Sequence, residues 1–106
     1  MKMKALHVIF ADTFGDEMIS EMKKMGVDAY TIIPELFGRG LSTDPRFNNH
    51  VWPGKNRMMI ILCDEKSASR IMERLNELRN ENPVEAIIFW TTPVLDISVH
   101  KKKLTL

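Results

Sequence analysis

Cysteine is almost missing from this chain, since Cys63 is the only one among 106 residues. A single cysteine excludes an internal disulfide and a zinc site built from cysteines. Cys63 ends an apolar run, a position where a free thiol usually behaves as a small buried hydrophobic side chain. We therefore expect a structural role for it.

A large net charge is also missing, because 15 Lys and Arg residues face 14 Asp and Glu residues and leave a net charge of +1. No global field then favours nucleic acid or a membrane surface. The apolar run over residues 5–11 is short, contains His7 and ends at Asp12. It is therefore neither a signal peptide nor a membrane span. We expect a cytoplasmic protein that neither binds nucleic acid nor inserts into membranes. We expect His7, with its apolar neighbours, to be a hydrogen-bonded core residue.

The composition, with 44% hydrophobic and 27% charged residues, is that of an ordinary globular protein, and the length suits one domain over residues 1–106. Asp12 and Thr13 could cap a first helix, which Gly26 would end. A second helix is expected to end near residues 80–83, and its apolar stripe consists of Ala68, Ile71, Met72, Leu75 and Leu78. Apolar, β-branched runs predict four strands, at residues 5–11, 29–34, 57–63 and 85–91.

This order of elements predicts an α+β fold of the ferredoxin-like type, a split βαβ pair (βαββαβ) with an antiparallel sheet. Right-handed crossovers would place both helices on one face of that sheet. An alternating stretch at residues 94–99 could add a short fifth strand at the C-terminal side. The runs MMIIL and AIIFW are continuously apolar, which predicts that both sheet faces are buried. Since the chain offers no third helix, we expect another copy to cover the second face.

A long connection over residues 36–55 separates the second and third predicted strands. Structureless connections of this length inside compact domains are mostly functional or disordered. Its first half contains Gly38, Arg39 and Gly40, where glycines permit a tight turn and the guanidinium suits a phosphate or carboxylate. A surface turn with a solvated arginine is the simpler interpretation of the same residues.

The second half of this loop holds Trp52, a large aromatic side chain that is costly to leave exposed. It could close over a ligand or pack against a neighbouring subunit. Lys55 and Arg46 add positive charge to the loop, and Lys101 belongs to a basic tail over residues 98–106. We infer a small anionic ligand or an acidic partner surface, although lysine-rich tails are often merely solvated.

The stretch VDAYTIIPELFGRG, preceded by a helix ending in MKKMG, resembles the second strand and loop start of the nitrogen-regulatory PII proteins. The resemblance extends more loosely over residues 4–97, and the HVWPG loop end is similar to that of small PII-like relatives. It implies a non-enzymatic homotrimer that binds an effector, such as an adenine nucleotide, between subunits and signals through the loop to a protein partner. Gly38 and Arg39 are the positions that carry over from the family pattern.

The chain also departs from the PII pattern. It has NENPVE where PII proteins carry a glycine- and lysine-rich segment that holds nucleotide phosphates. Val99, His100 and Lys101 stand where the family has paired arginines. Tyr30 is the only tyrosine and lies on a predicted strand, so the modified loop tyrosine of many PII proteins has no counterpart.

Other function classes find less support. Catalysis would need a nucleophile motif or a paired acid and base, and the chain shows neither. A related interpretation is a metal-sensing trimer of the CutA type, in which His50, with Asp44 or His100 of a neighbouring chain, binds a divalent metal. A purely structural trimer, whose loop only completes the interface, is the remaining alternative.

Overall fold

The computed structural model describes residues 2–36 and 55–99 of the chain. Its elements follow the order β1 (Met3–Ala11), the 3-10 helix η1 (Asp12–Phe14), α1 (Gly15–Lys24), β2 (Thr31–Leu36), β3 (Asn56–Asp64), α3 (Glu65–Glu81) and β4 (Ile88–Val94). This is the predicted βαββαβ order, so the ferredoxin-like α+β fold is confirmed.

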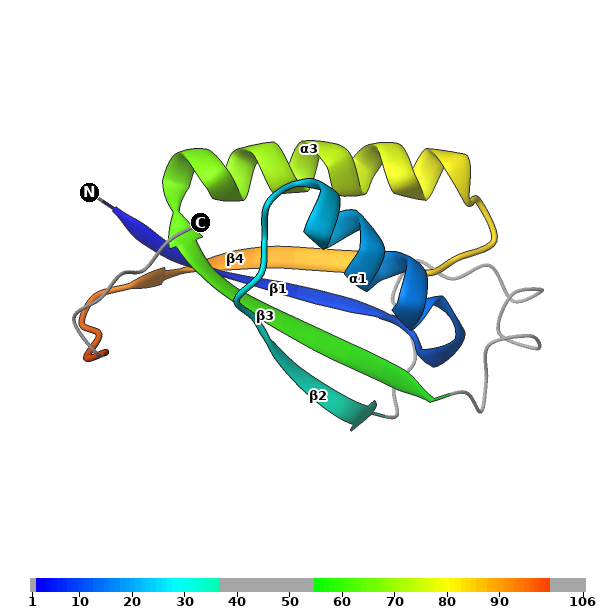
Figure 1. Ribbon diagram of the computed structural model, residues 1–106, viewed down its shortest axis with the longest axis horizontal. Coiled ribbons are helices and arrows are strands. Elements are labelled where there is room, and N and C mark those ends of the chain that lie inside the picture. Colours follow the sequence, from blue (N-terminus) through cyan, green and yellow to red (C-terminus); the bar gives the residue numbers. More distant parts are fainter. Residues whose placement is uncertain (1, 37–54, 100–106) are drawn as a thin grey trace.

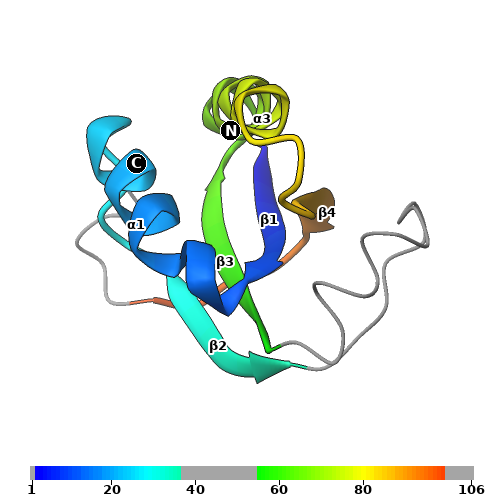
Figure 2. The ribbon, with the colours of Figure 1, turned by 90° about the vertical axis from the view of Figure 1, so that its right-hand side faces the viewer.

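The strands form one antiparallel sheet with the order β2-β3-β1-β4. Both helices lie on the same side of this sheet, as the two views show (Figure 1, Figure 2). We call the side without helices the open face. The two central strands, β1 and β3, therefore carry the core on one face and the open face on the other.

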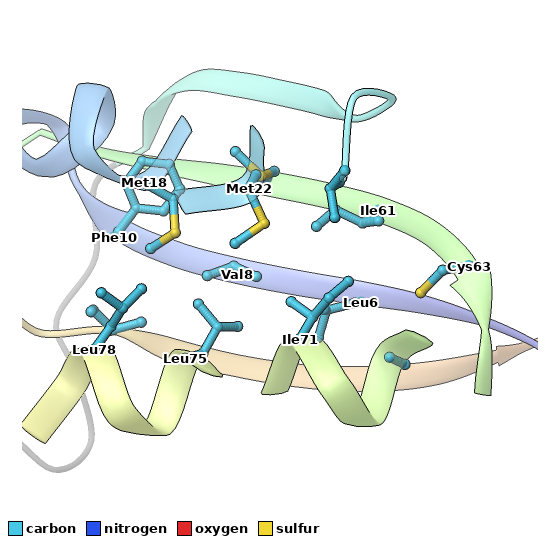
Figure 3. Packing of buried hydrophobic residues seen from close by; sticks show 14 of the residues in the cluster. Leu6, Val8, Phe10, Met18, Met22, Ile61, Cys63, Ile71, Leu75 and Leu78 are labelled. Atoms are coloured by element: carbon cyan, nitrogen blue, oxygen red, sulfur yellow. The ribbon is translucent and has the colours of Figure 1, made fainter. Parts of the chain in front are cut away.

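The core fills the space between the helices and the sheet (Figure 3). Alternate residues of the central strands point into it, because successive side chains of a strand point to opposite faces. The predicted apolar stripe of α3 is confirmed, except that Met72 is only partly buried. Cys63 is 2% exposed, which confirms its structural placement. Side chains with no exposed surface are Leu6, Val8, Phe10, Met18, Met22, Met59, Ile61, Ile71 and Leu75.

The first helix does not begin as predicted. Neither Asp12 nor Thr13 caps it, since α1 begins at Gly15 and its N-cap residue, Phe14, makes no side-chain capping bond. Asp12 instead binds the guanidinium of Arg57. A guanidinium attracts a carboxylate more strongly than a neutral backbone N–H does, so Asp12 binds Arg57 and does not cap the helix.

The strands β2 and β4 also differ from the prediction, by two or three residues at each end. β2 begins at Thr31 and runs through Pro34, which we expected to close it. A proline is tolerated there because β2 is an edge strand and its register is irregular between Ile33 and Leu36. β4 runs from Ile88 to Val94, three residues later than expected.

The fifth strand expected over residues 94–99 does not form. Val94 is the last residue of β4, and residues 95–99 have no strand conformation. Val94 pairs with Met3, the first residue of β1. Past this pair β1 offers no further backbone partner. Leu95 is therefore left 88% exposed instead of continuing the sheet.

Candidate functional site

The two ends of the long loop lie side by side. Leu36, the last residue of β2, pairs with Asn56, the first residue of β3. The described ends of the loop therefore meet at one end of the sheet. Six residues of the predicted sites lie outside the described part of the chain, so the predictions for them stay predictions: Gly38, Arg39, Gly40, His50, Trp52 and Lys101.

Lys55 is the predicted site residue that the structure places. Its Nζ lies 3.5 Å from Oε1 of Glu35, and the two side chains are 60% and 63% exposed. Exposed pairs of this kind contribute only about 0–1 kcal/mol. The ammonium group can therefore exchange Glu35 for an anionic ligand at little cost.

A second contact, which the sequence did not predict, fixes the end of the loop to the start of α1. The backbone N–H of Asp12 donates to the carbonyl oxygen of Lys55 over 2.9 Å. Nε of Arg57 donates to Oδ1 of Asp12 over 2.5 Å. A Cβ atom at Gly15 would lie 2.7 Å from a terminal nitrogen of Arg57, so glycine leaves room for the guanidinium.

Glu85 is the one charged residue in the turn between α3 and β4, residues 82–87. Burial and the nearby carboxylate of Glu17 raise the pKa of Glu85 in this turn. Arg79 donates from Nε to the carbonyl oxygen of Ile87 over 3.0 Å, with a second bond from Nη2, and lies 4.9 Å from the ring centre of Phe89. Its guanidinium thus fixes Ile87, the residue before β4.

Residues 80–87 include no lysine, unlike the glycine- and lysine-rich segment that PII proteins carry before the fourth strand.

The open face is apolar, as the continuous runs predicted. Ile33, Leu62 and Trp90 are 37%, 38% and 39% exposed on it. His7 also lies on this face, so its predicted place in the core is wrong. The reason is strand alternation, which buries Leu6 and Val8 on either side of it.

His7 is held by two neighbours on β4. Its ring stacks on Trp90 with centroids 5.0 Å apart and an angle of 6° between the planes. Its Nε2 lies 3.3 Å from Oγ1 of Thr92. The residue was expected to be hydrogen-bonded, and it is, though on the open face.

The described residues hold neither a metal-ligand cluster nor a membrane-spanning helix. Among residues 2–36 and 55–99, no three His, Cys, Asp or Glu side chains lie close enough to hold a metal ion. Within the same residues, no helix has the length and apolar character needed to cross a membrane. The loop end instead offers a loosely paired cation beside the paired ends of β2 and β3.

Comparisons with known proteins agree with this geometry. The family model described as nitrogen regulatory protein P-II matches residues 3–103. A protein from Thermus thermophilus, described as PII-like and signalling, has a similar structure with a TM-score of 0.64 and 25% identity; the match covers 89% of this chain and 88% of that one. No curated protein matches the chain significantly.

CPII from Thiomonas intermedia, a nitrogen regulatory PII-like protein, has the same fold. Its complex with ADP, AMP and bicarbonate matches with a TM-score of 0.69 and 15% identity, over 93% of this chain and 98% of that one. Its apo form matches with a TM-score of 0.62 and 17% identity, over 89% and 92% of the two chains. Because the family model covers almost the whole sequence, the chain belongs to the nitrogen regulatory protein P-II family, whose members are non-enzymatic, ligand-binding proteins of signal transduction.

Proposed function

We propose that this protein is a cytoplasmic, PII-like regulator that binds a small anionic effector between the subunits of a homotrimer. The loop over residues 36–55 carries the state of the site to a partner protein. The observation that carries the proposal is the P-II family match over residues 3–103, which includes the whole loop. The paired ends of β2 and β3 support it, because they give the loop a fixed base.

The trimer is supported by the open face. Its side chains on β1, β3 and β4 are mostly apolar, and the two helices of the described structure cover the opposite face. Large exposed apolar surfaces on one protein usually mark an interface. Homo-oligomers with closed symmetry are the commonest way for a chain to cover such a surface.

The effector class is supported by the cations at the loop. The CPII structure holds ADP, AMP and bicarbonate, which are all anions. Within the loop over residues 36–55, Arg39 and Lys55 are the cations nearest in sequence to the paired strand ends, and Lys101 adds a cation from the tail. An adenine nucleotide, bicarbonate or both are the effectors we propose.

Calorimetric titration with ADP, AMP and bicarbonate tests the proposal. We expect Arg39→Ala to weaken the binding effector about tenfold to hundredfold, because a hydrogen bond to a charged group contributes roughly 1.5–3 kcal/mol. Lys23→Ala is the control, since it removes an exposed cation of α1, outside the loop, and should change the affinity little. Equal affinities of Arg39→Ala and the wild type would contradict the proposed site.

The metal alternative has its own outcome in the same experiment. If none of the three anions binds, and zinc binds to the wild type but not to His50→Ala, the protein is a metal-binding trimer of the CutA type. If neither anions nor zinc bind, the structural trimer is favoured.

A further inference from the structure

A single imidazole lies in the middle of the open face. His7 is on β1, a central strand, where it pairs with Ile60 of β3 on one side and with Trp90 of β4 on the other. Directly paired residues of antiparallel strands project to the same face. The ring of His7 is therefore surrounded by the apolar side chains that a second subunit would cover.

No charged group faces this imidazole from the described strands. The neighbouring position on β2 is Thr31, which pairs with Ile60. Asp64 lies in the outermost row of the face, opposite Met3, and its carboxylate accepts a hydrogen bond of 2.7 Å from the backbone N–H of Ser67. The remaining open-face neighbours of His7 are Ala5, Ile9, Met58, Leu62, Ile88, Trp90 and Thr92.

We propose that His7 makes the assembly of the subunits sensitive to pH, so that the trimer is stable with a neutral imidazole and weakens when the ring is protonated. The inference rests on the proposed trimer, in which a second copy of this chain covers the open face. A copy of the chain is the fitting occupant, because the described strands present no charge around His7 for a charged partner to recognise.

Desolvation supplies the physical cause. A neutral imidazole can accept the hydroxyl hydrogen of Thr92 at Nε2 and remain satisfied when a neighbouring subunit excludes water. An imidazolium under the same cover loses its hydration and finds no carboxylate among the described neighbours. The ring of Trp90 attracts an imidazolium, but that contact exists within one chain and is therefore present before and after assembly.

The sign and size of the effect follow from linkage. Assembly selects the neutral ring, so the association constant falls as the pH is lowered through the range where histidine side chains gain a proton. A tenfold fall in the fraction of neutral rings weakens assembly about tenfold per chain and about a thousandfold per trimer. The protein concentration at half assembly should then rise about thirtyfold.

Sedimentation equilibrium at pH 7.5 and pH 5.5 tests this inference. For the wild type we expect the half-assembly concentration to rise by about this factor at pH 5.5, with an unchanged far-UV circular dichroism spectrum. His7→Phe keeps an aromatic ring over Trp90 but cannot take up a proton, so its half-assembly concentration should be equal at both pH values. His100→Gln is the matched control and should keep the wild-type response.

Several results would overturn the inference. These are an equal half-assembly concentration of the wild type at both pH values, a pH response that persists in His7→Phe, or loss of the circular dichroism signal at pH 5.5. If His7→Phe does not assemble, His7→Gln takes its place, because glutamine is also neutral. If neither variant assembles at pH 7.5, His7 is needed for packing between subunits and not for a response to pH. A wild-type monomer at pH 7.5 would overturn the proposed trimer itself, which distinguishes the two failures.

Discussion

At the scale of single residues, Glu21 and Arg74 join the two helices. Nε of Arg74 donates to Oε1 of Glu21 over 3.0 Å, and its Nη1 lies 3.0 Å from carboxylate oxygens of both Glu77 and Glu81. The Glu21 side chain is only 14% exposed. The hydrogen bond from Arg74 outweighs partial burial and lowers the pKa of Glu21. One guanidinium thus ties the end of α1 to the middle of α3.

This pair predicts a pH-dependent stability. Because the pKa of Glu21 is lower in the folded chain, its stabilisation is full above the unfolded pKa of about 4.3 and is lost as the pH falls through the folded value. Glu21→Gln should therefore lower the free energy of unfolding by about 1 kcal/mol at pH 7. Urea unfolding at pH 7 and pH 3 measures this difference. A difference that stays the same at pH 3 would contradict the assignment.

Cys63 carries a second prediction at this scale. Burial is the main cause that raises the pKa of its thiol, and the thiolate is the reactive form. In the folded protein at pH 7.5 we expect the thiol to react with an aromatic disulfide reagent at least about a hundredfold more slowly than in urea. The rate of colour release measures this ratio. Similar rates in both states would show that Cys63 is accessible.

At the scale of elements, patterns predicted which segments become helices and strands but not where each one begins. The stripe of α3 was predictable because its burial follows the helical period. The start of α1 was not, since it depends on the contact of Asp12 with Arg57, which is 45 positions away. In the same way, whether residues 94–99 form a strand depends on whether β1 still offers a partner there.

The candidate site shows the same division. The length and composition of the loop pointed to residues 36–55, and Lys55, its last residue, lies directly before β3. The stack of His7 on Trp90 was not predicted. It depends on the register of β1 against β4, which pairs these two residues and which the sequence alone does not give. Local pattern locates a site, but the partners of each side chain come from the topology.

The open face allows a prediction at the scale of β3. Leu62 is 38% exposed on this face, so Leu62→Lys should leave the separate chain folded but place an unpaired charge under the neighbouring subunit. Burying such a charge costs several kcal/mol, which raises the half-assembly concentration at least about a hundredfold. Size-exclusion chromatography with circular dichroism measures both properties.

Val84→Lys is the matched control for this experiment. Val84 is 64% exposed and lies in the turn between α3 and β4, outside the strands that form the open face. The same charge there should leave assembly unchanged. Equal assembly of the two variants and the wild type would show that the open face is not the interface.

At the scale of the whole molecule, family membership and geometry point to the same arrangement. The P-II match covers residues 3–103, and the described fold leaves one sheet face apolar and without helices, the face that the proposed trimer would cover. The end of the loop is joined to η1 through Asp12, whose backbone N–H donates to Lys55 and whose carboxylate accepts a hydrogen bond from Arg57. A trimer would place three such loops and three such faces in one assembly.

The mass of the wild-type protein in solution at pH 7.5, measured by sedimentation equilibrium, decides whether the chains form a trimer. We expect one species with about three times the chain mass of 12.3 kDa at micromolar concentration. Folding should be confirmed on the same sample by circular dichroism. A well-folded species of 12.3 kDa would contradict the trimer and, with it, an effector site built between subunits.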